Sequence, residues 1–348
     1  MNAIAGALWN PIVAKEYRSR MRTWRSPVAM IAYVTLLGGM GWAVFSAISV
    51  TALSQGIGGN SYGQMGQTLF TALIIFQVAL ISFITPAVTA GAISGERERQ
   101  TIDLLFVTPL PPFSIIWGKL LASMSFALLL LFLSVPIFSL VFLFGGIELD
   151  QLVYAFLVSA VTALMLGLVG LACSVFFKRT LAATVAAYGA AFVLLVGTLV
   201  YGLLFPVDID PSATSLPAPP AVTFVGPVIP LLTIASNTPL TGYGVRIPNG
   251  GPGIYASGSS CTTGPNGVTQ CFSNSGAKGP PIALQSGQPT TGGTVTSGLF
   301  KGWQYWQASI LMQLVICLAA LVFSALMLPP VRSLRRRFRP ARKLDVTL

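Results

Sequence analysis

The sequence predicts an all-α membrane protein with six transmembrane helices. Only 8% of its 348 residues are charged, whereas 54% are hydrophobic, and the mean hydropathy is +0.77. Soluble domains carry roughly 25% charged residues because their surfaces face water. The second observation is a series of long uncharged runs, since about 20 apolar residues in a helix cross the hydrocarbon core of a bilayer. Lipid is therefore the expected solvent for most of this chain.

Six apolar runs are long enough to span a bilayer. No Asp, Glu, Lys or Arg occurs between Ser26 and Gly95, and a Gly-, Ser- and Gln-rich stretch at 54–67 divides this long run into two. Pro136 lies inside the third run, where contacts with neighbouring helices can compensate for the lost hydrogen bond. The predicted spans are 27–51, 68–92, 120–147, 152–177, 181–205 and 303–328.

The spans define the organisation of the whole chain. An interfacial segment (1–26) precedes spans one to five (27–205), which include a charged loop at 91–112. An extracytoplasmic loop domain (206–302) separates span five from span six (303–328), and a basic tail (329–348) follows. Within the loop domain, 217–240 is apolar but broken by proline, which suggests a short re-entrant or interfacial piece. The rest is rich in Gly, Ser, Thr and Pro, which favours turns and irregular or short β structure.

The placement of the basic residues predicts the orientation. Seventeen of the 20 Lys and Arg lie in the N-terminal segment, the loops after spans two and four, and the tail, all on one side of the six spans. The other three, Arg246, Lys278 and Lys301, lie in or beside the 206–302 loop. Because cytoplasmic loops carry the excess of Lys and Arg, both termini are expected to be cytoplasmic. Basic residues that border apolar runs in this way do not indicate a nucleic-acid partner.

The segment 10–26 is predicted to be an amphipathic helix in the cytoplasmic interface. Asn10 can cap such a helix, and Pro11 suits its first position. An apolar, aromatic face and a basic face then lie on different sides, with the basic edge toward lipid phosphates. The alternative is a positively charged anchor for the first span, and no cleaved signal peptide is expected. The residues in question are Lys15, Tyr17, Arg18, Arg22, Trp24 and Arg25.

The loop at 91–112 reads GAISGERERQTIDLLFVTPLPP. Its Glu-Arg-Glu-Arg run predicts a self-neutralising charged turn, and a short apolar helix follows before the prolines end it. An apolar helix held outside the membrane by charges usually docks against another surface. The alternative is that Leu104, Leu105 and Phe106 sink into the lipid headgroups.

Several classes of function lack their chemistry in this chain. There is no His, so imidazole is excluded as a general base, a pH switch or a metal ligand, and no metal site is predicted. The predicted spans contain no Asp, Glu, Lys or Arg of the kind that proton relays and ion-coupled carriers use. An intramembrane enzyme is disfavoured for the same reasons. No G-x-x-x-x-G-K-[ST] phosphate loop occurs, so active transport needs a partner that supplies energy.

Two runs of sequence resemble type-2 ATP-binding-cassette (ABC) permeases. SGERERQTIDLLFVTPLPPFSIIWGKLLA is similar to the loop after their second span, and NPIVAKEYRSRMRTWRSP is similar to the connecting helix ahead of their first span. The resemblance extends over roughly 10–205 and, by position only, over 303–328. The loop at 206–302 is larger than the short outer helices of that family.

The resemblance implies a permease subunit of an ATP-driven exporter in the cytoplasmic (inner) membrane of a bacterium or archaeon. A coupling helix at 96–109 would dock on a separate ATPase subunit, which would hold ATP and Mg, so no cofactor is expected in this chain. A second permease chain, identical or different, would complete the pathway. The coupling residues carried over are Glu96, Arg97, Glu98, Arg99, Thr101, Asp103, Leu104 and Leu105. The alternative function is a non-transporting membrane scaffold whose external domain binds an envelope or membrane partner.

Three further features suggest contacts. Alanines recur every fourth residue in span five, at 182, 186 and 190 and at 183, 187 and 191, a spacing that lets helices approach closely. The family would place the face made by Ala182, Ala186 and Ala190 near the dimer interface, whereas packing within one bundle is the alternative. The tail at 332–343 is expected to bind anionic lipid, with a regulatory ATPase contact as the alternative.

The cysteines fall into two groups. Cys173 and Cys317 lie in apolar runs and are expected to pack as small hydrophobic residues. Cys261 and Cys271 lie in the polar loop on the predicted oxidising side of the membrane, where disulfides form. We expect these two to be joined, the alternative being two free thiols.

The predicted topology can be tested by labelling single cysteines in a background without other thiols. Ser257→Cys should react with a membrane-impermeant maleimide in intact cells, because residue 257 lies in the external loop. Ser333→Cys should react only after the membrane is opened. Labelling of residue 333 from outside would refute the topology.

Overall fold

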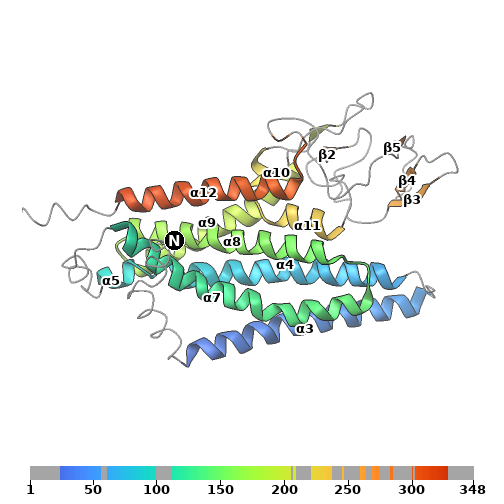
Figure 1. Cartoon of the computed structure of the whole chain (residues 1–348), viewed down its shortest axis with the longest axis horizontal. Coiled ribbons are helices and arrows are strands. Elements are labelled where there is room, and N and C mark those ends of the chain that lie inside the picture. The colour runs from blue at the N-terminus through green and yellow to red at the C-terminus, as the bar shows by residue number, and fades with distance from the viewer. Residues whose placement is uncertain are drawn as a thin grey trace, which may run out of the picture.

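The computed structural model describes most of the helical part of the chain and small parts of the 206–302 loop. The described residues are 24–55, 61–98, 112–204, 207–208, 221–236, 245–246, 259–263, 269–273, 283–284, 300 and 302–327. They form a bundle of long, roughly antiparallel helices, with short elements gathered at one end (Figure 1). The predicted interfacial helix and the basic tail lie outside these residues, apart from Trp24, Arg25 and Ser26.

Six helices of the described part are long and apolar enough to cross a membrane, which confirms the predicted number. The fifth is continuous through three segments, α9, a π-helical turn η2 and α10, and we call this composite helix span five. The spans are α3 (Arg25–Gln55), α4 (Ser61–Thr89), α7 (Pro112–Val141), α8 (Leu149–Phe176), α9 (Thr180–Phe192) with η2 (Val193–Gly197) and α10 (Thr198–Leu204), and α12 (Tyr305–Met327).

Two of these helices begin seven and eight residues earlier than the sequence predicted. Helix α4 starts at Ser61, inside the Gly-rich stretch that we expected to be a loop, so the break between spans one and two is short. Helix α7 starts at Pro112 rather than at residue 120. A proline is well suited to the first turn of a helix, because its missing N–H would have had no partner there. The prolines Pro86 and Pro136 lie inside α4 and α7 without ending either helix.

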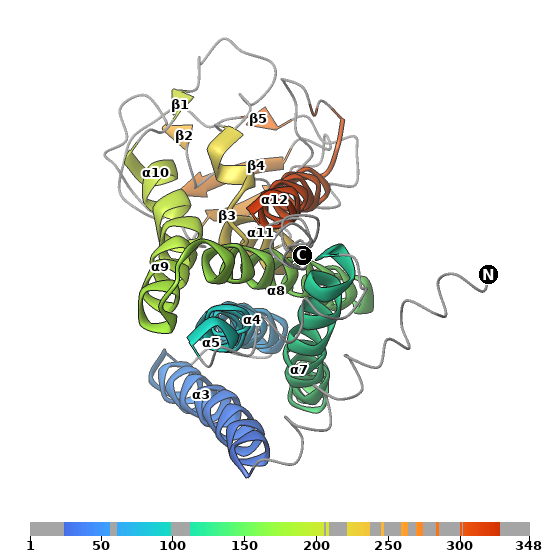
Figure 2. The same cartoon turned by 90° about the vertical axis from the view of Figure 1, so that its left-hand side faces the viewer.

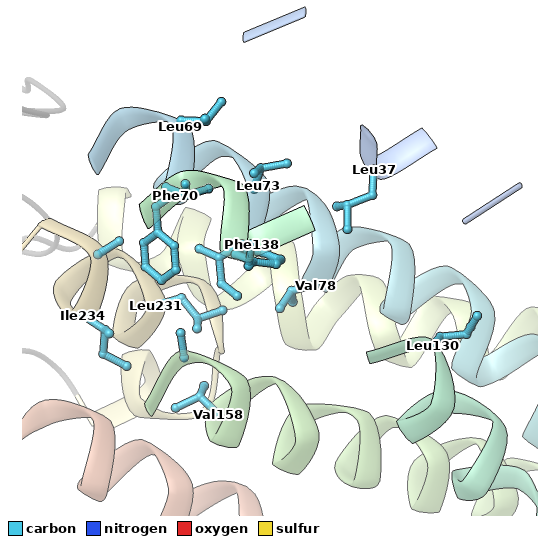
Figure 3. Packing of buried hydrophobic residues seen from close by; sticks show 14 of the residues in the cluster. Leu37, Leu69, Phe70, Leu73, Val78, Leu130, Phe138, Val158, Leu231 and Ile234 are labelled. Atoms are coloured by element: carbon cyan, nitrogen blue, oxygen red, sulfur yellow. The ribbon is translucent and has the colours of Figure 1, made fainter. Parts of the chain in front are cut away.

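Helix α8 is the centre of the bundle. It packs against α4, α7, α9 and α12, while α3 lies at the periphery beside α4 and α7 (Figure 2). One buried apolar cluster, toward the end of the bundle that holds α11 (Val228–Ser236), joins α3, α4, α7 and α8 (Figure 3). Phe138 makes edge-to-face contacts there with Phe70 and Phe156, with ring centroids 5.8 and 5.2 Å apart.

Helices α4 and α8 approach each other closely at two glycines of α8. A Cβ atom on Gly170 would lie 2.2 Å from Thr89 Oγ1 and 3.7 Å from the Pro86 Cα atom. At Gly167 a Cβ would lie 3.5 Å from Thr85 Cγ2 of α4, and it would also meet the end of the Met124 side chain of α7. The missing side chains therefore set the distance between the two helices, as small residues do at helix contacts in lipid.

The described elements of the 206–302 loop lie at the end of the bundle opposite α5 (Ser94–Glu98) (Figure 1). A 3₁₀ turn, η3 (Ala221–Phe224), and α11 pack among α4, α8, α10 and α12, and Leu231 and Ala235 of α11 are buried. Five short strands complete the described part of this loop. They are β1 (Val207–Asp208) paired in parallel with β2 (Val245–Arg246), and an antiparallel sheet β3 (Ser259–Thr263), β4 (Thr269–Ser273) and β5 (Ala283–Leu284).

The close approach of α4 and α8 predicts a specific loss of stability. Gly170→Ala should lower the free energy of unfolding by about 1–3 kcal/mol, because the added methyl overlaps the stiff, β-branched Thr89. Thermal unfolding in detergent, followed by tryptophan fluorescence, measures the change. Gly39→Ala in α3 is the matched control, since a Cβ there meets nothing within 4 Å. Equal unfolding temperatures for the two variants would contradict this account of the contact.

Candidate functional site

The charged segment after span two forms a short helix, α5, at the end of the bundle where α3 begins and α12 ends (Figure 1). Its backbone continues in helical hydrogen bonds, from the Gly95 N–H to the Gly91 carbonyl and from the Arg97 N–H to the Ile93 carbonyl. The Ser94 hydroxyl donates to the Ala90 carbonyl at 2.9 Å. The sequence predicted a charged turn at the Glu-Arg-Glu-Arg run. As far as Glu98 this prediction is wrong, because these hydrogen bonds keep the backbone helical.

Ser174, near the end of α8, holds the start of α5. Its hydroxyl oxygen accepts hydrogen bonds from the N–H groups of Ile93 and Ser94, each at 2.9 Å. Ser94 and Ser174 are both fully buried. The first N–H groups of a helix have no partner within it, so Ser174 supplies a buried acceptor that α5 lacks. This contact fixes α5 against span four.

Arg97 makes a second contact with α8. Its Nη1 donates to the Val175 carbonyl at 3.3 Å, in the last turn of α8. The last carbonyls of a helix have no intrahelical donor, and the helix dipole favours a cation there. Arg97 therefore supplies both a hydrogen-bond donor and a positive charge to the end of span four.

Glu98 connects α5 to the start of span five. Its Oε1 accepts the Thr180 backbone N–H at 2.8 Å, and its Oε2 accepts the Thr180 hydroxyl at 2.9 Å. Arg179, the residue that precedes α9, gives the helix no side-chain cap, so the acceptor comes from α5 instead. The carboxylate also faces the positive end of the α9 dipole.

The same two hydrogen bonds act on the protonation of Glu98. The backbone N–H of Thr180, then its hydroxyl and finally the charge of Arg179 hold the pKa of the exposed Glu98 carboxyl below its usual value, although partial desolvation opposes them. Because the folded-state pKa is lowered, the contact is complete above the ordinary carboxyl pKa and is lost as the pH falls through the lowered value. At neutral pH Glu98 is an anion that joins two elements.

The structure brings three of the predicted coupling residues together in this arrangement, namely Glu96, Arg97 and Glu98. Glu96 is half-buried in the first turn of α5. Trp24 is exposed just before α3, and Arg25 is the first residue of that helix. The other predicted residues of the two segments lie outside the described part: Lys15, Tyr17, Arg18, Arg22, Arg99, Thr101, Asp103, Leu104 and Leu105.

The two alanine rows of span five lie in different surroundings. Ala183, Ala187 and Ala191 are buried against the rest of the bundle. In the predicted packing face, Ala182 is exposed and Ala186 and Ala190 are half-buried. One row therefore serves packing within the chain, and the other remains on its surface.

Two residues of the site were not anticipated from the sequence. Thr180 follows a basic pair and precedes an apolar run, which is a recognisable signal for a helix start. Ser174 has no such signal, because its partners are 80 and 81 positions earlier in the chain. Polar contacts deeper in the bundle were equally hidden; Thr162 of α8, for example, donates to Gln313 of α12 at 3.2 Å.

Comparison with known proteins identifies the family of this helical bundle. The family model described as ABC-2 family transporter protein matches residues 26–247, which is well over half of the chain. The search of curated proteins found no match to this chain. The match covers spans one to five and α5, including the run at 94–122 that resembles type-2 ABC permeases, whereas the similar run at 10–27 lies almost wholly outside it. The chain belongs to the ABC-2 family, as a membrane-spanning permease component of an ABC transporter.

Proposed function

We propose that this chain is the permease subunit of an ATP-driven exporter and receives its energy through residues 91–112 from a separate ATPase subunit. The observation that supports this proposal most is the attachment of α5 to two spans. Ser174 and Val175 hold it to the end of α8, and Thr180 holds it to the start of α9. A force applied to this segment would therefore reach spans four and five directly.

The composition of the chain supports an external source of energy. The sequence has no phosphate-binding loop, and the predicted spans have no carboxylate or His that could carry a proton. A permease of this kind needs a partner that binds and hydrolyses ATP with Mg. We therefore assign both ATP and the metal to the ATPase subunit rather than to this chain.

The segment that follows α5 is the proposed docking element. Residues 99–111 lie outside the described part, but their sequence places Leu104 and Leu105 shortly after the attachment points of α5. Apolar side chains beside Arg97 and Glu98 would give a partner both a hydrophobic contact and charges to pair. The ATPase groove would then hold one end of a segment whose other end is fixed to the spans.

A second permease chain is the other proposed partner. The surface row of Ala182, Ala186 and Ala190, together with the exposed Gly189, leaves part of span five without bulky side chains. A Cβ on Gly189 would meet nothing within 4 Å. Small residues of this kind allow a helix of another chain to approach closely in lipid. Lipid would cover the apolar surface that remains.

Replacement of both Leu104 and Leu105 by Asp tests the docking element. The double variant should lose a co-expressed ATPase subunit, because it removes apolar contact and buries two charges at the interface. Insertion into the membrane should be normal, since the spans are unchanged. Co-purification and ATP turnover of the complex are the measurements.

Leu149→Asp is the control for an added charge. Leu149 is exposed at the first turn of α8, on the opposite end of the bundle, where an acidic residue is tolerated. The control should keep the ATPase and its activity. If the double variant inserts normally and also keeps full activity, residues 104–105 do not couple the subunits, and the scaffold function gains support.

We also propose the disulfide between Cys261 and Cys271. The structure shows no disulfide among its described residues, and the two side chains lie outside them. The backbone pairing nevertheless places residue 261 directly opposite residue 271 across β3 and β4. Directly opposite positions of an antiparallel pair bring Cα atoms to about 4.5–5.5 Å, within the range of disulfides.

Intact-mass analysis after alkylation in denaturant measures the pairing. The chain has four cysteines, so a Cys261–Cys271 bond should leave two sites for alkylation without reductant and four with it. The bond closes a short loop, and its reduction should cost on the order of 3 kcal/mol in the chain-entropy model. Four alkylated thiols in the unreduced, natively oxidised protein would rule the bond out.

A further inference from the structure

We propose that span five is a mechanical link between α5 and the outer helix α11, and that Glu98 is the positioning residue at its inner end. The inference deepens the proposed function, because it states where a displacement of α5 goes. The inference depends on the proposed function in one respect only, namely that the ATPase subunit is what displaces α5. The contacts themselves belong to this chain alone and are present at both ends of span five.

The inner joint is the bidentate contact between Glu98 and Thr180. Two hydrogen bonds of 2.8 and 2.9 Å to one residue fix both the position and the direction of the start of α9 relative to α5. Gly95 lies close to the same residue, since a Cβ added to it would lie 3.7 Å from Thr180 Cγ2. A shift of α5 should therefore carry the start of α9 with it.

The middle of span five is built to move as one piece. Its buried face consists of Ala183, Ala187 and Ala191, which present small and similar surfaces to α8 and α4. Such a face interlocks less deeply than large side chains do, and it permits sliding along the helix axis. This sliding would break the hydrogen bond from the Tyr188 hydroxyl to the Phe83 carbonyl of α4, which is 2.9 Å long.

The outer joint lies at the π-helical turn η2, where regular helical geometry is interrupted. Thr198 follows this turn and donates its hydroxyl to the Leu194 carbonyl at 2.9 Å. Gly226, just before α11, sits directly on that hydroxyl, because a Cβ there would lie 2.1 Å from Thr198 Oγ1. Short π-helical turns often occur at functional positions. The segment that leads into α11 thus rests on this turn.

Three further contacts complete the outer joint. A Cβ on Gly202 of α10 would lie 3.3 Å from Thr223 Cγ2 in η3, and Thr223 bonds to the Tyr305 hydroxyl of α12 at 2.9 Å. At the other end of α11, Gln67 of α4 donates to the Ala235 carbonyl at 2.9 Å. Helix α11 therefore packs among spans two, four and six, and span five contacts η3 and the segment just before α11. Movement of span five would change how α11 sits among them.

A disulfide reporter at the outer joint can detect this connection in the full chain without any ATPase. In a background that lacks the native cysteines, Gly202→Cys and Thr223→Cys are added, because a Cβ at residue 202 would lie 3.3 Å from the γ position of residue 223, which a sulfur atom can occupy. The half-time of cross-linking under a mild oxidant is measured in lipid nanodiscs. Adding Glu98→Ala should lengthen the half-time about fivefold. Without the Glu98 contact the start of α9 is no longer fixed, so the distance between residues 202 and 223 varies more and the two sulfur atoms meet less often.

Glu148→Gln is the matched control. Like Glu98, Glu148 is a carboxylate beside the start of a span, because it is the N-cap residue of α8. Unlike Glu98, it lies at the outer end of the bundle, away from α5 and from the start of α9. Its half-time should equal that of the parent. Thr180→Val keeps the backbone bond to Glu98 and should slow cross-linking about twofold; combined with Glu98→Ala it should add nothing further.

An unchanged half-time in an inserted Glu98→Ala chain would overturn the inference, as would equal slowing by Glu148→Gln. If Glu98→Ala does not insert, Thr180→Val decides the question by the same criterion. Because the chain is measured alone, failure of the Leu104 and Leu105 test would not alter this result. Conversely, an unchanged half-time would leave the proposed ATPase contact intact.

Discussion

The close approach of α4 and α8 is the contact on which the rest of the described structure depends. The bilayer core offers no water to polar groups, so helices there must satisfy their backbones internally and associate by close packing. Gly170 lets the end of α4 lie directly against α8, beside Thr89. That distance places Ser174 within reach of the N–H groups of Ile93 and Ser94, which follow α4. The position of α5 is thus a consequence of helix packing within the membrane-spanning part.

Hydrogen bonds at the two ends of the bundle fix particular residues to particular partners, which the apolar packing in the middle does not do. Apolar packing holds helices together without fixing one residue to one partner, whereas hydrogen bonds are directional. At one end Arg97 and Glu98 reach the end of α8 and the start of α9. At the other end, Thr223 bonds to Tyr305 and Gln67 bonds to the end of α11. Span five is hydrogen-bonded to α5 at one end and packs against η3 and the segment before α11 at the other.

The sequence was most informative where lipid imposes the strictest rule. A membrane helix must be long, apolar and uncharged, so the six spans could be recognised from their runs alone. Their ends were less certain, because Pro112 and the glycines before residue 68 are compatible with both a helix start and a loop. The repeated alanines predicted a packing surface but not which row faces inward, since adjacent rows differ by one residue. Ser174 stayed hidden because its partners in the loop are remote in sequence.

The central claim is that residues just beyond α5 dock on a separate ATPase subunit, and cross-linking from residue 105 tests it most directly. A photo-reactive amino acid in place of Leu105 would be activated in native membranes, and its covalent products identified by mass spectrometry. The account predicts an adduct with an ATP-binding-cassette ATPase subunit, and a lower yield when Leu104 is also replaced by Asp. Adducts with lipid alone would show that this side chain lies in the headgroups, and would contradict the claim.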